Sequence, residues 1–184
     1  MSMHQAIDLI LAENRQVLQK VDFGAVTKLG EAISQSKRIF VTGEGRCGLV
    51  VRMFAMRLMH LGCQDFVVGE TITPSIQAND LLIDCSGSGA TGNVLSIAEK
   101  AQAIGARIVS ITTQPDSPLG KIASIVIHID AAAKQDYSHE HSQQFAGSLF
   151  EQSTLLLLDA VFHVMAQKTN KSAETLYSLH ANLE

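Results

Sequence analysis

The chain has 184 residues, a length that fits one domain with a substantial core and leaves little room for two. Hydrophobic residues make up 46% of the chain and charged residues 17%, a balance typical of globular proteins rather than disordered or fibrous ones. The formal net charge of −4 argues against broad binding of nucleic acid, which needs a basic face. A small anionic ligand would therefore be held by local hydrogen-bond donors.

The N-terminal sequence lacks the charged and apolar segments of a signal peptide, and apolar runs such as 155–158 end after a few residues at Asp159. We therefore expect a cytoplasmic protein that does not bind a membrane. Three cysteines, Cys47, Cys63 and Cys85, lack the spacing of a metal or redox motif. They fit reduced thiols in a reducing compartment, and two of them are expected simply to pack.

Two amphipathic helices are predicted at the start of the chain, at 3–20 and 23–35, because their apolar residues follow helical spacing. Asp22 is suited to cap the second of them. Two helices before the first strand are more than a minimal α/β unit needs. We therefore favour an oligomer interface here over simple cover for the core.

Short apolar segments then alternate with helical ones. Strands are predicted at 38–42, 66–68, 81–85, 107–112 and 124–129, with helices at 49–61, 93–104 and 119–123 and a short helical connection from Thr73. The apolar residues of helix 49–61, Met53 and Met56 among them, are expected to pack in the core. A polar stretch at 130–146 leads to an apolar helix at 147–167 and a final helix at 172–183.

This alternation predicts an α/β fold with a doubly wound, five-stranded parallel sheet in the flavodoxin-like order 2-1-3-4-5. We expect one domain over residues 1–184. Its parts would be N-terminal helices in 1–36, a sheet core with two ligand loops in 37–130, and C-terminal helices in 147–184.

A loop rich in glycine and serine, Ser86-Gly87-Ser88-Gly89-Ala90-Thr91-Gly92, separates the third predicted strand from the following helix. Backbone N–H groups, three hydroxyls and a helix N-terminus would surround one point there, an arrangement that suits a phosphate. Serine and threonine also cap helices without any ligand. The loop alone therefore leaves both interpretations open.

A second glycine-rich loop, Gly43-Glu44-Gly45-Arg46-Cys47-Gly48, follows the first predicted strand. It has the G-x-G-x-x-G pattern of a dinucleotide site, and Glu70 lies about 20 residues farther on. Arg46, however, would place a bulky cation where a pyrophosphate approaches bare backbone. In the expected strand order, strands one and three end at one crevice, so both loops would face one ligand. This pairing favours the phosphate interpretation.

Two titratable residues outside the loops are candidates for the site. Glu151 lies near the start of the helix at 147–167, and His180 lies near the C-terminus. Each has a structural alternative, as a carboxylate favoured by the helix dipole or as a histidine on a frayed end. The polar segment 136–141 contains a His-x-His pair beside carboxylates but lacks the fixed geometry that zinc needs, so no metal site is predicted.

Several runs of the sequence are distinctive together. They are Phe54 to Gly62, Val68 to Glu70, Thr73-Pro74, Ser86 to Gly89, Leu149 to Gln152 and His180 to Glu184. With these runs the chain closely resembles, over nearly its whole length, the 6-phospho-3-hexuloisomerase family of the sugar isomerase (SIS) domain group. The resemblance implies interconversion of D-arabino-hex-3-ulose 6-phosphate and fructose 6-phosphate by a homotetramer without cofactor or metal. The implied setting is formaldehyde fixation through the ribulose monophosphate pathway.

The resemblance also implies roles for individual residues. The implied substrate-binding residues are Gly45, Arg46, Cys47, Ser86, Gly87, Ser88, Gly89 and Thr91, with the phosphate on the last five. Glu151 matches a carboxylate proposed as the base in SIS isomerases. His180 matches a terminal histidine that reaches an active site, expected to be that of a neighbouring subunit.

The chain departs from the usual pattern of this family at a few positions. Ala90 stands where glutamate is common, Cys47 replaces serine, the pair 145–146 replaces Pro-Met, and Leu179 replaces a basic or polar residue. These departures leave open an isomerase of another phosphosugar or a non-catalytic module that senses one. An NAD-dependent oxidoreductase would depend on the pattern at 43–48 alone.

Overall fold

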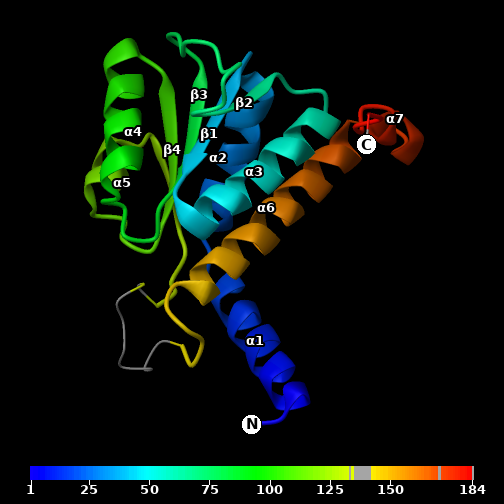
Figure 1. Ribbon diagram of the computed structural model, residues 1–184. Helices are drawn as coiled ribbons and strands as arrows, with labels where there is room; N and C mark the ends of the chain where they lie inside the picture. The colour runs from blue at the N-terminus through cyan, green and yellow to red at the C-terminus, as the bar shows by residue number, and fades with distance from the viewer. Residues whose placement is uncertain (133, 135–141, 170, 184) are drawn as a thin grey trace.

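The fold is organised around a parallel sheet. The structure, a computed structural model, describes residues 1–132, 134, 142–169 and 171–183. Its strands are β1 (Ile39–Gly43), β2 (Asp65–Val67), β3 (Leu81–Cys85), β4 (Arg107–Thr112) and β5 (Ile125–His128), all parallel and in the order β2-β1-β3-β4-β5. The predicted doubly wound, five-stranded α/β fold is confirmed (Figure 1).

Helices cover both faces of this sheet. They are α1 (Met3–Leu18), α2 (Phe23–Gln35), α3 (Gly45–His60), α4 (Gly92–Ile104), α5 (Pro118–Ile122), α6 (Ser148–Lys168) and α7 (Ala173–Tyr177). Figure 1 shows α2, α3 and α6 on one side of the sheet and α4 and α5 on the other. Helices α3 and α6 lie side by side, and α1 projects from the body beyond the start of α6.

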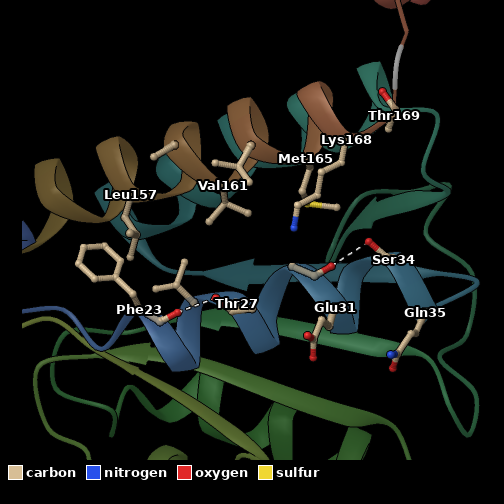
Figure 2. A pocket seen from close by; sticks show the side chains of 14 residues that line it. Phe23, Thr27, Glu31, Ser34, Gln35, Leu157, Val161, Met165, Lys168 and Thr169 are labelled. Carbon is tan, nitrogen blue, oxygen red and sulfur yellow. Dashed lines mark hydrogen bonds between the residues drawn. The ribbon is translucent and has the colours of Figure 1, made fainter.

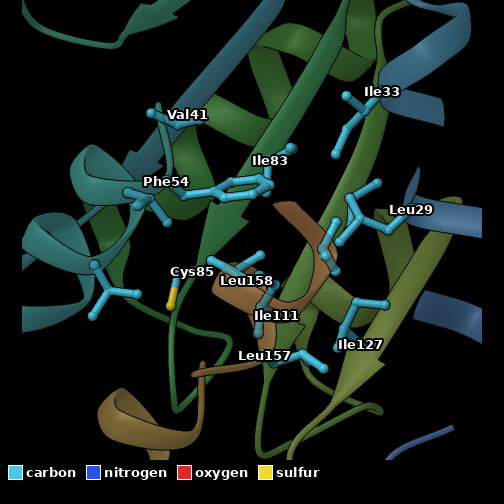
Figure 3. Close-up of a cluster of buried hydrophobic side chains, with 14 of the residues drawn as sticks. Leu29, Ile33, Val41, Phe54, Ile83, Cys85, Ile111, Ile127, Leu157 and Leu158 are labelled. Carbon is cyan, nitrogen blue, oxygen red and sulfur yellow. The ribbon is translucent and has the colours of Figure 1, made fainter. Parts of the chain in front are cut away.

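Strand β3 shows how the sequence fills both faces. Leu81, Ile83 and Cys85 belong to the core between the sheet and α2, α3 and α6, whereas Leu82 belongs to the core under α4 and α5. This alternation follows from the two-residue period of a strand, and both faces are buried because helices cover both. In Figure 3, Ile83 and Cys85 lie among core side chains that include Phe54 of α3 and Leu158 of α6.

Three element predictions need correction. Helix α3 begins at Gly45 rather than at residue 49. Its first turn packs directly on β1, since a Cβ atom on Gly48 would lie 2.5 Å from the Gly43 carbonyl oxygen. No helix forms from Thr73. Helix α7 ends at Tyr177, because the amides of Leu179 and His180 bond three residues back and tighten the chain into turns.

The predicted core role of Met53 and Met56 is also wrong. Their exposed fractions are 52% and 43%, because they lie on the side of α3 that faces away from the sheet. Helix α6 is long and apolar enough to cross a membrane by length and composition. Its buried residues, including Leu149 and Leu158, instead pack in the core beside α3, as expected of a core helix.

One buried acid interrupts the apolar sheet. Asp84 of β3 lies between Thr42 of β1 and Ser110 of β4 in register. The Ser110 hydroxyl donates a hydrogen bond of 2.6 Å to its Oδ2 atom, and its Oδ1 atom is buried without a hydrogen-bond partner. Burial raises the pKa of Asp84 from its ordinary value of 3.8 to about 7, against the opposing effect of the Ser110 bond.

Asp84 should make the protein less stable as the pH rises from 5 to 7. Between the two pKa values the folded protein holds the proton and the unfolded chain does not, so the free energy of unfolding falls by about 1.4 kcal/mol per pH unit. Denaturant unfolding at pH 5, 6 and 7 should show Asp84→Asn gaining about 2 kcal/mol relative to the wild type over this range. The exposed carboxylate Asp159 provides the control Asp159→Asn. Parallel pH profiles for wild type and Asp84→Asn would contradict the expectation.

Candidate active site

The segment from Ser86 to Thr91 forms a tight loop between β3 and α4. The Gly89 amide donates to the Ser86 carbonyl at 3.0 Å, which closes a turn. The hydroxyls of Ser86 and Thr91 hydrogen-bond each other at 2.8 Å across the loop. The Ala90 amide donates to the Ser88 hydroxyl at 3.3 Å. The loop thus brings three hydroxyls together at the start of α4, as the sequence predicts.

The loop rests on a platform that the sequence analysis missed. The hydroxyls of Thr112, the last residue of β4, and of Thr113, which follows it, both donate to the Gly87 carbonyl, at 3.0 and 2.9 Å. The Leu119 amide of α5 donates to the Gly89 carbonyl at 3.0 Å. Both glycine carbonyls are therefore held on the β4 and α5 side. A threonine pair at the end of a strand next to the loop was the available sequence signal.

Three helix N-termini at this site have no side-chain cap. Helices α1, α2, α5 and α7 begin with backbone amides that donate to the capping side chains of Ser2, Asp22, Ser117 and Ser172. Helices α3, α4 and α6 begin at Glu44, Thr91 and Gly147 without one. The first-turn amides of a helix lack intrahelical partners and carry the positive end of the helix dipole. Uncapped amides are therefore available to an anion at all three starts.

Two side-chain contacts join these three helix starts. The Asn93 amide group in the first turn of α4 donates to Oε1 of Glu44, before α3, at 2.6 Å. Nε of Arg46, in the first turn of α3, forms an ion pair with Oε2 of Glu151, in the first turns of α6. The predicted site residues Gly45, Arg46, Cys47, Ser86 to Gly89, Thr91 and Glu151 therefore gather at one end of α3.

Glu151 is sheltered while its partner is open to solvent. Its side chain is 14% exposed, and that of Arg46 is 62% exposed. A carboxylate this deep is held by its ion pair, and an arginine this exposed is free to exchange partners. The pair therefore places one sheltered carboxylate and one solvent-exposed cation at the same point.

Helix α1 positions the start of α6, a role that the sequence analysis missed. Asn14 is buried, donates to the side chain of Gln152 at 2.7 Å and accepts from the Ser153 hydroxyl at 2.9 Å. Glu13 accepts from the Ser142 hydroxyl at 2.7 Å and the Gln143 amide at 2.9 Å, just before α6. These bonds fix the turn of α6 that carries Glu151. A polar Asn14 in an amphipathic helix was the signal.

His180 does not join the other predicted site residues within this chain. Its Nδ1 atom lies 3.0 Å from Nε2 of His60, at the last turn of α3, and the two rings stack with centroids 5.2 Å apart. Burial, then the charge of Arg57, then His180 lower the pKa of His60. Fourteen residues of helix separate His60 from Arg46, a rise of about 21 Å at 1.5 Å per residue. His180 and Glu151 therefore lie at opposite ends of α3.

Two other features of the sequence were considered as parts of a site: the acid at Glu70 and the His-x-His segment. Glu70, the acid expected of a dinucleotide site, forms an ion pair with Arg52 of α3 on the surface. Segment 136–141, with its His-x-His pair, lies outside the described residues. Among the residues that the structure does describe, no group of three His, Cys, Asp or Glu is placed to hold a metal ion.

Gly89 should be indispensable to the loop, whereas Gly92 should not. Gly89 has a φ of +58°, and a Cβ atom there would lie 1.9 Å from the Ser117 hydroxyl oxygen. A Cβ atom on Gly92 would meet nothing within 4 Å. We expect Gly89→Ala to lower the free energy of unfolding by about 2 kcal/mol or more and Gly92→Ala to change it by less than about 0.5 kcal/mol. Denaturant unfolding of both variants tests this, and equal effects would refute the loop geometry.

Comparisons with known proteins agree with one another. A model of the SIS domain family matches residues 32–163. The chain is 48% identical over 178 residues to the 3-hexulose-6-phosphate isomerase of Mycobacterium gastri, covering 97% of this chain and 89% of that one. It is 39% identical over 158 residues to the 3-hexulose-6-phosphate isomerase of Bacillus subtilis, covering 85% of each.

A solved structure of a Methanococcus jannaschii protein, for which a molecular function of 3-hexulose-6-phosphate isomerase was inferred, has a TM-score of 0.85 with this chain. The two are 32% identical, and the match covers 98% of this chain and 99% of the other. The resemblance drawn from the sequence is thereby confirmed. The chain belongs to the SIS domain family and, within it, to the 3-hexulose-6-phosphate isomerases.

Proposed function

We propose that the chain interconverts D-arabino-hex-3-ulose 6-phosphate and fructose 6-phosphate through an enediolate at the site between the starts of α3, α4 and α6. The observation that carries this proposal is the convergence of three uncapped helix N-termini on a hydroxyl-lined loop beside a sheltered carboxylate. Groups suited to phosphate binding and a carboxylate suited to proton transfer therefore lie close together. The identity of the sugar is inferred from the family to which the chain belongs.

The phosphate group would bind at the start of α4. The hydroxyls of Ser86, Ser88 and Thr91 can donate to its oxygens, and the free first-turn amides of α4 add donors and a favourable dipole. The Gly89 amide is already bonded to the Ser86 carbonyl, so we assign Gly89 a conformational role in the loop. Binding energy from the phosphate would hold the far end of the sugar against Glu151.

Glu151 would act as the proton-transfer group. Moving the carbonyl from C3 to C2 requires removal of the proton on C2, formation of an enediolate and return of a proton to C3. One carboxylate on one face of the intermediate can perform both transfers. The first turns of α6 hold Glu151 in place through the Asn14 network, which limits its motion between the two carbon atoms.

Arg46 would change partners during the reaction. In the free protein it pairs with Glu151, and its exposed side chain leaves it free to turn toward the substrate. Transfer of Arg46 to the enediolate oxygens would stabilise their negative charge and release Glu151 as a base. The ion pair thus keeps the carboxylate oriented until the substrate arrives.

A homotetramer is supported by apolar surface that one chain leaves uncovered. The α1 helix carries exposed Met3, Ile7 and Leu11 along one stripe. An apolar groove of about 570 Å³ runs between α2 and α6, lined by Phe23, Leu157, Val161 and Met165 among others (Figure 2). We infer that further copies of this chain cover both surfaces. In such an assembly His180 of one copy would complete the site of another, at the oxygen atoms of the substrate.

A cytoplasmic role in formaldehyde fixation through the ribulose monophosphate pathway fits this activity. The pathway supplies the hexulose phosphate on which the proposed reaction acts. Three free cysteines agree with a reducing compartment.

Glu151→Gln should abolish turnover without abolishing binding. The substitution keeps the shape of the side chain and removes the base, so kcat should fall by a factor of about 100 or more while the affinity for fructose 6-phosphate changes little. The assay is conversion of D-arabino-hex-3-ulose 6-phosphate in the presence of a chelator, with calorimetry for binding. Ser88→Ala, which should weaken binding of phosphorylated sugars, is the matched control.

Either of two results would redirect the proposal. Near-wild-type turnover by Glu151→Gln would reject Glu151 as the base. A wild-type protein that binds phosphosugars without turnover of this hexulose phosphate would point to a sensor or to an isomerase of another phosphosugar.

Mixing two inactive variants should restore activity if His180 acts in a neighbouring subunit. Co-expressed Glu151→Gln and His180→Ala chains would form hybrid assemblies in which some sites hold both intact residues. We expect each variant alone to be nearly inactive and the hybrids to recover a measurable fraction of wild-type turnover. Light scattering would confirm that every sample has the mass of a tetramer. Hybrids as inactive as the parents would show that His180 does not act across subunits.

A further inference from the structure

The fold brings together two cysteines that lie 38 positions apart in the sequence. Cys47 is in the first turn of α3, and Cys85 is the last residue of β3. The carbonyl carbon of Cys47 and the carbonyl oxygen of Cys85 each lie 3.1 Å from the position of a Cβ atom built on Gly43. Gly43 is also the register partner of Cys85 in the sheet, so Cys47 and Cys85 flank the same glycine. The two cysteines are therefore neighbours in the fold, a pairing that their sequence spacing did not indicate.

Cys47 has the surroundings of a reactive thiol. Its sulfur interacts with the Cys85 thiol and with the backbone amide of Gly87, and the hydrogen bond from Cys85 chiefly lowers the pKa of Cys47, against burial and the charge of Glu151. It lies at the uncapped start of α3, whose dipole also favours a thiolate. The side chain is only partly buried, so small oxidants can reach it.

Cys85 has the opposite character. It is fully buried in the core shown in Figure 3, and its hydrogen bond to Cys47, together with burial, raises its pKa well above the ordinary thiol value. It therefore stays a protonated thiol that donates to its neighbour. The pair combines one partly buried, thiolate-prone sulfur with one fully buried thiol next to it.

We propose that Cys47 and Cys85 form a peroxide-reactive pair that closes into a disulfide and thereby blocks anion binding at the loop from Ser86 to Thr91. The Cys47 thiolate attacks hydrogen peroxide, breaks the O–O bond and becomes a sulfenic acid, while hydroxide leaves and takes up a proton. The Cys85 sulfur then attacks the sulfenic sulfur, the S–O bond breaks, and the thiol proton leaves with the hydroxyl group as water. Peroxide is reduced and the two thiols are oxidised.

The disulfide would alter the anion site because its two residues form the walls of that site. Cys47 adjoins Arg46, and Cys85 adjoins Ser86. A covalent bond would draw the first turn of α3 against the end of β3 and take the sulfur away from the Gly87 amide. The predicted loss of phosphosugar binding assumes the proposed function, whereas disulfide formation does not. Transient disulfides of this kind are compatible with a reducing compartment.

Cys63 provides an internal comparison within the same chain. It lies beyond the other end of α3 and, like Cys47, is partly buried. Burial and the charge of Asp65 raise its pKa, against the opposing effect of Lys171. A thiol of similar exposure with the opposite pKa shift should react slowly, so Cys63 reports the reactivity of an ordinary thiol in this protein.

The test is peptide mapping by mass spectrometry of the intact, wild-type protein after treatment with hydrogen peroxide, without reduction. We expect peptides containing Cys47 and Cys85 to be linked, with Cys63 left as a free thiol, and dithiothreitol to reverse the linkage. Alkylation by iodoacetamide at pH 7 should be at least about tenfold faster at Cys47 than at Cys63. Calorimetry should show that the oxidised protein no longer binds fructose 6-phosphate and that the reduced protein does.

Variants distinguish the role of Cys47 in oxidation from that of Cys85. In Cys85→Ser, whose hydroxyl can still donate to Cys47, peroxide should drive Cys47 past the sulfenic acid to the sulfinic acid, because no resolving thiol is present. Cys63→Ser should form the same linked peptides as the wild type. Absence of linked peptides from the wild type, or unchanged sugar binding by the linked protein, would overturn the inference. Failure of the reduced protein to bind fructose 6-phosphate would instead count against the proposed function, because the peptide mapping needs no ligand.

Discussion

The ion pair between Arg46 and Glu151 is the contact on which the arrangement of the site depends. Glu151 is largely withdrawn from water, and a charge in that position is costly unless a partner compensates it. Arg46 supplies this compensation from the neighbouring helix and so fixes the starts of α3 and α6 relative to each other. Because α3 also packs on β1 and β3, the pair ties the carboxylate to the edge of the sheet where the loops after β1 and β3 begin.

The helices of this fold differ in whether a side chain caps their N-termini. Four helices have side-chain caps, each worth about 1 kcal/mol, whereas α3, α4 and α6, whose starts are joined at the site, do not. The fold therefore forgoes some stability at α3, α4 and α6. The amides left free there are suited to an anionic ligand, whose binding would restore the missing hydrogen bonds. Asp84, buried near the same end of β3 with one oxygen unpartnered, adds to this local cost.

The sequence predicts the parts of this structure that depend on local patterns. Apolar periodicity located the strands and most helices, and the strand order placed the loops at Gly43 and Ser86 together. The sequence could not reveal the supporting roles of Thr112 and Asn14 or the proximity of Cys47 and Cys85, because each depends on partners distant in the chain. The short extent of α7 was missed for the same reason, since the contact of His180 with His60 and two tight turns replace further helix.

The parallel packing of α3 and α6 keeps His180 far from Glu151 within one chain. Both helices begin at the ion pair, and both end where Lys171 donates to the Leu61 carbonyl and His180 meets His60. A carboxylate and a histidine at opposite ends of one rigid unit cannot act on the same small sugar. Two copies related by a two-fold axis perpendicular to these helices have them antiparallel, so that the histidine end of each can lie beside the carboxylate end of the other. A catalytic role for His180 therefore requires the assembly, and the apolar surfaces on α1, α2 and α6 are where that assembly would form.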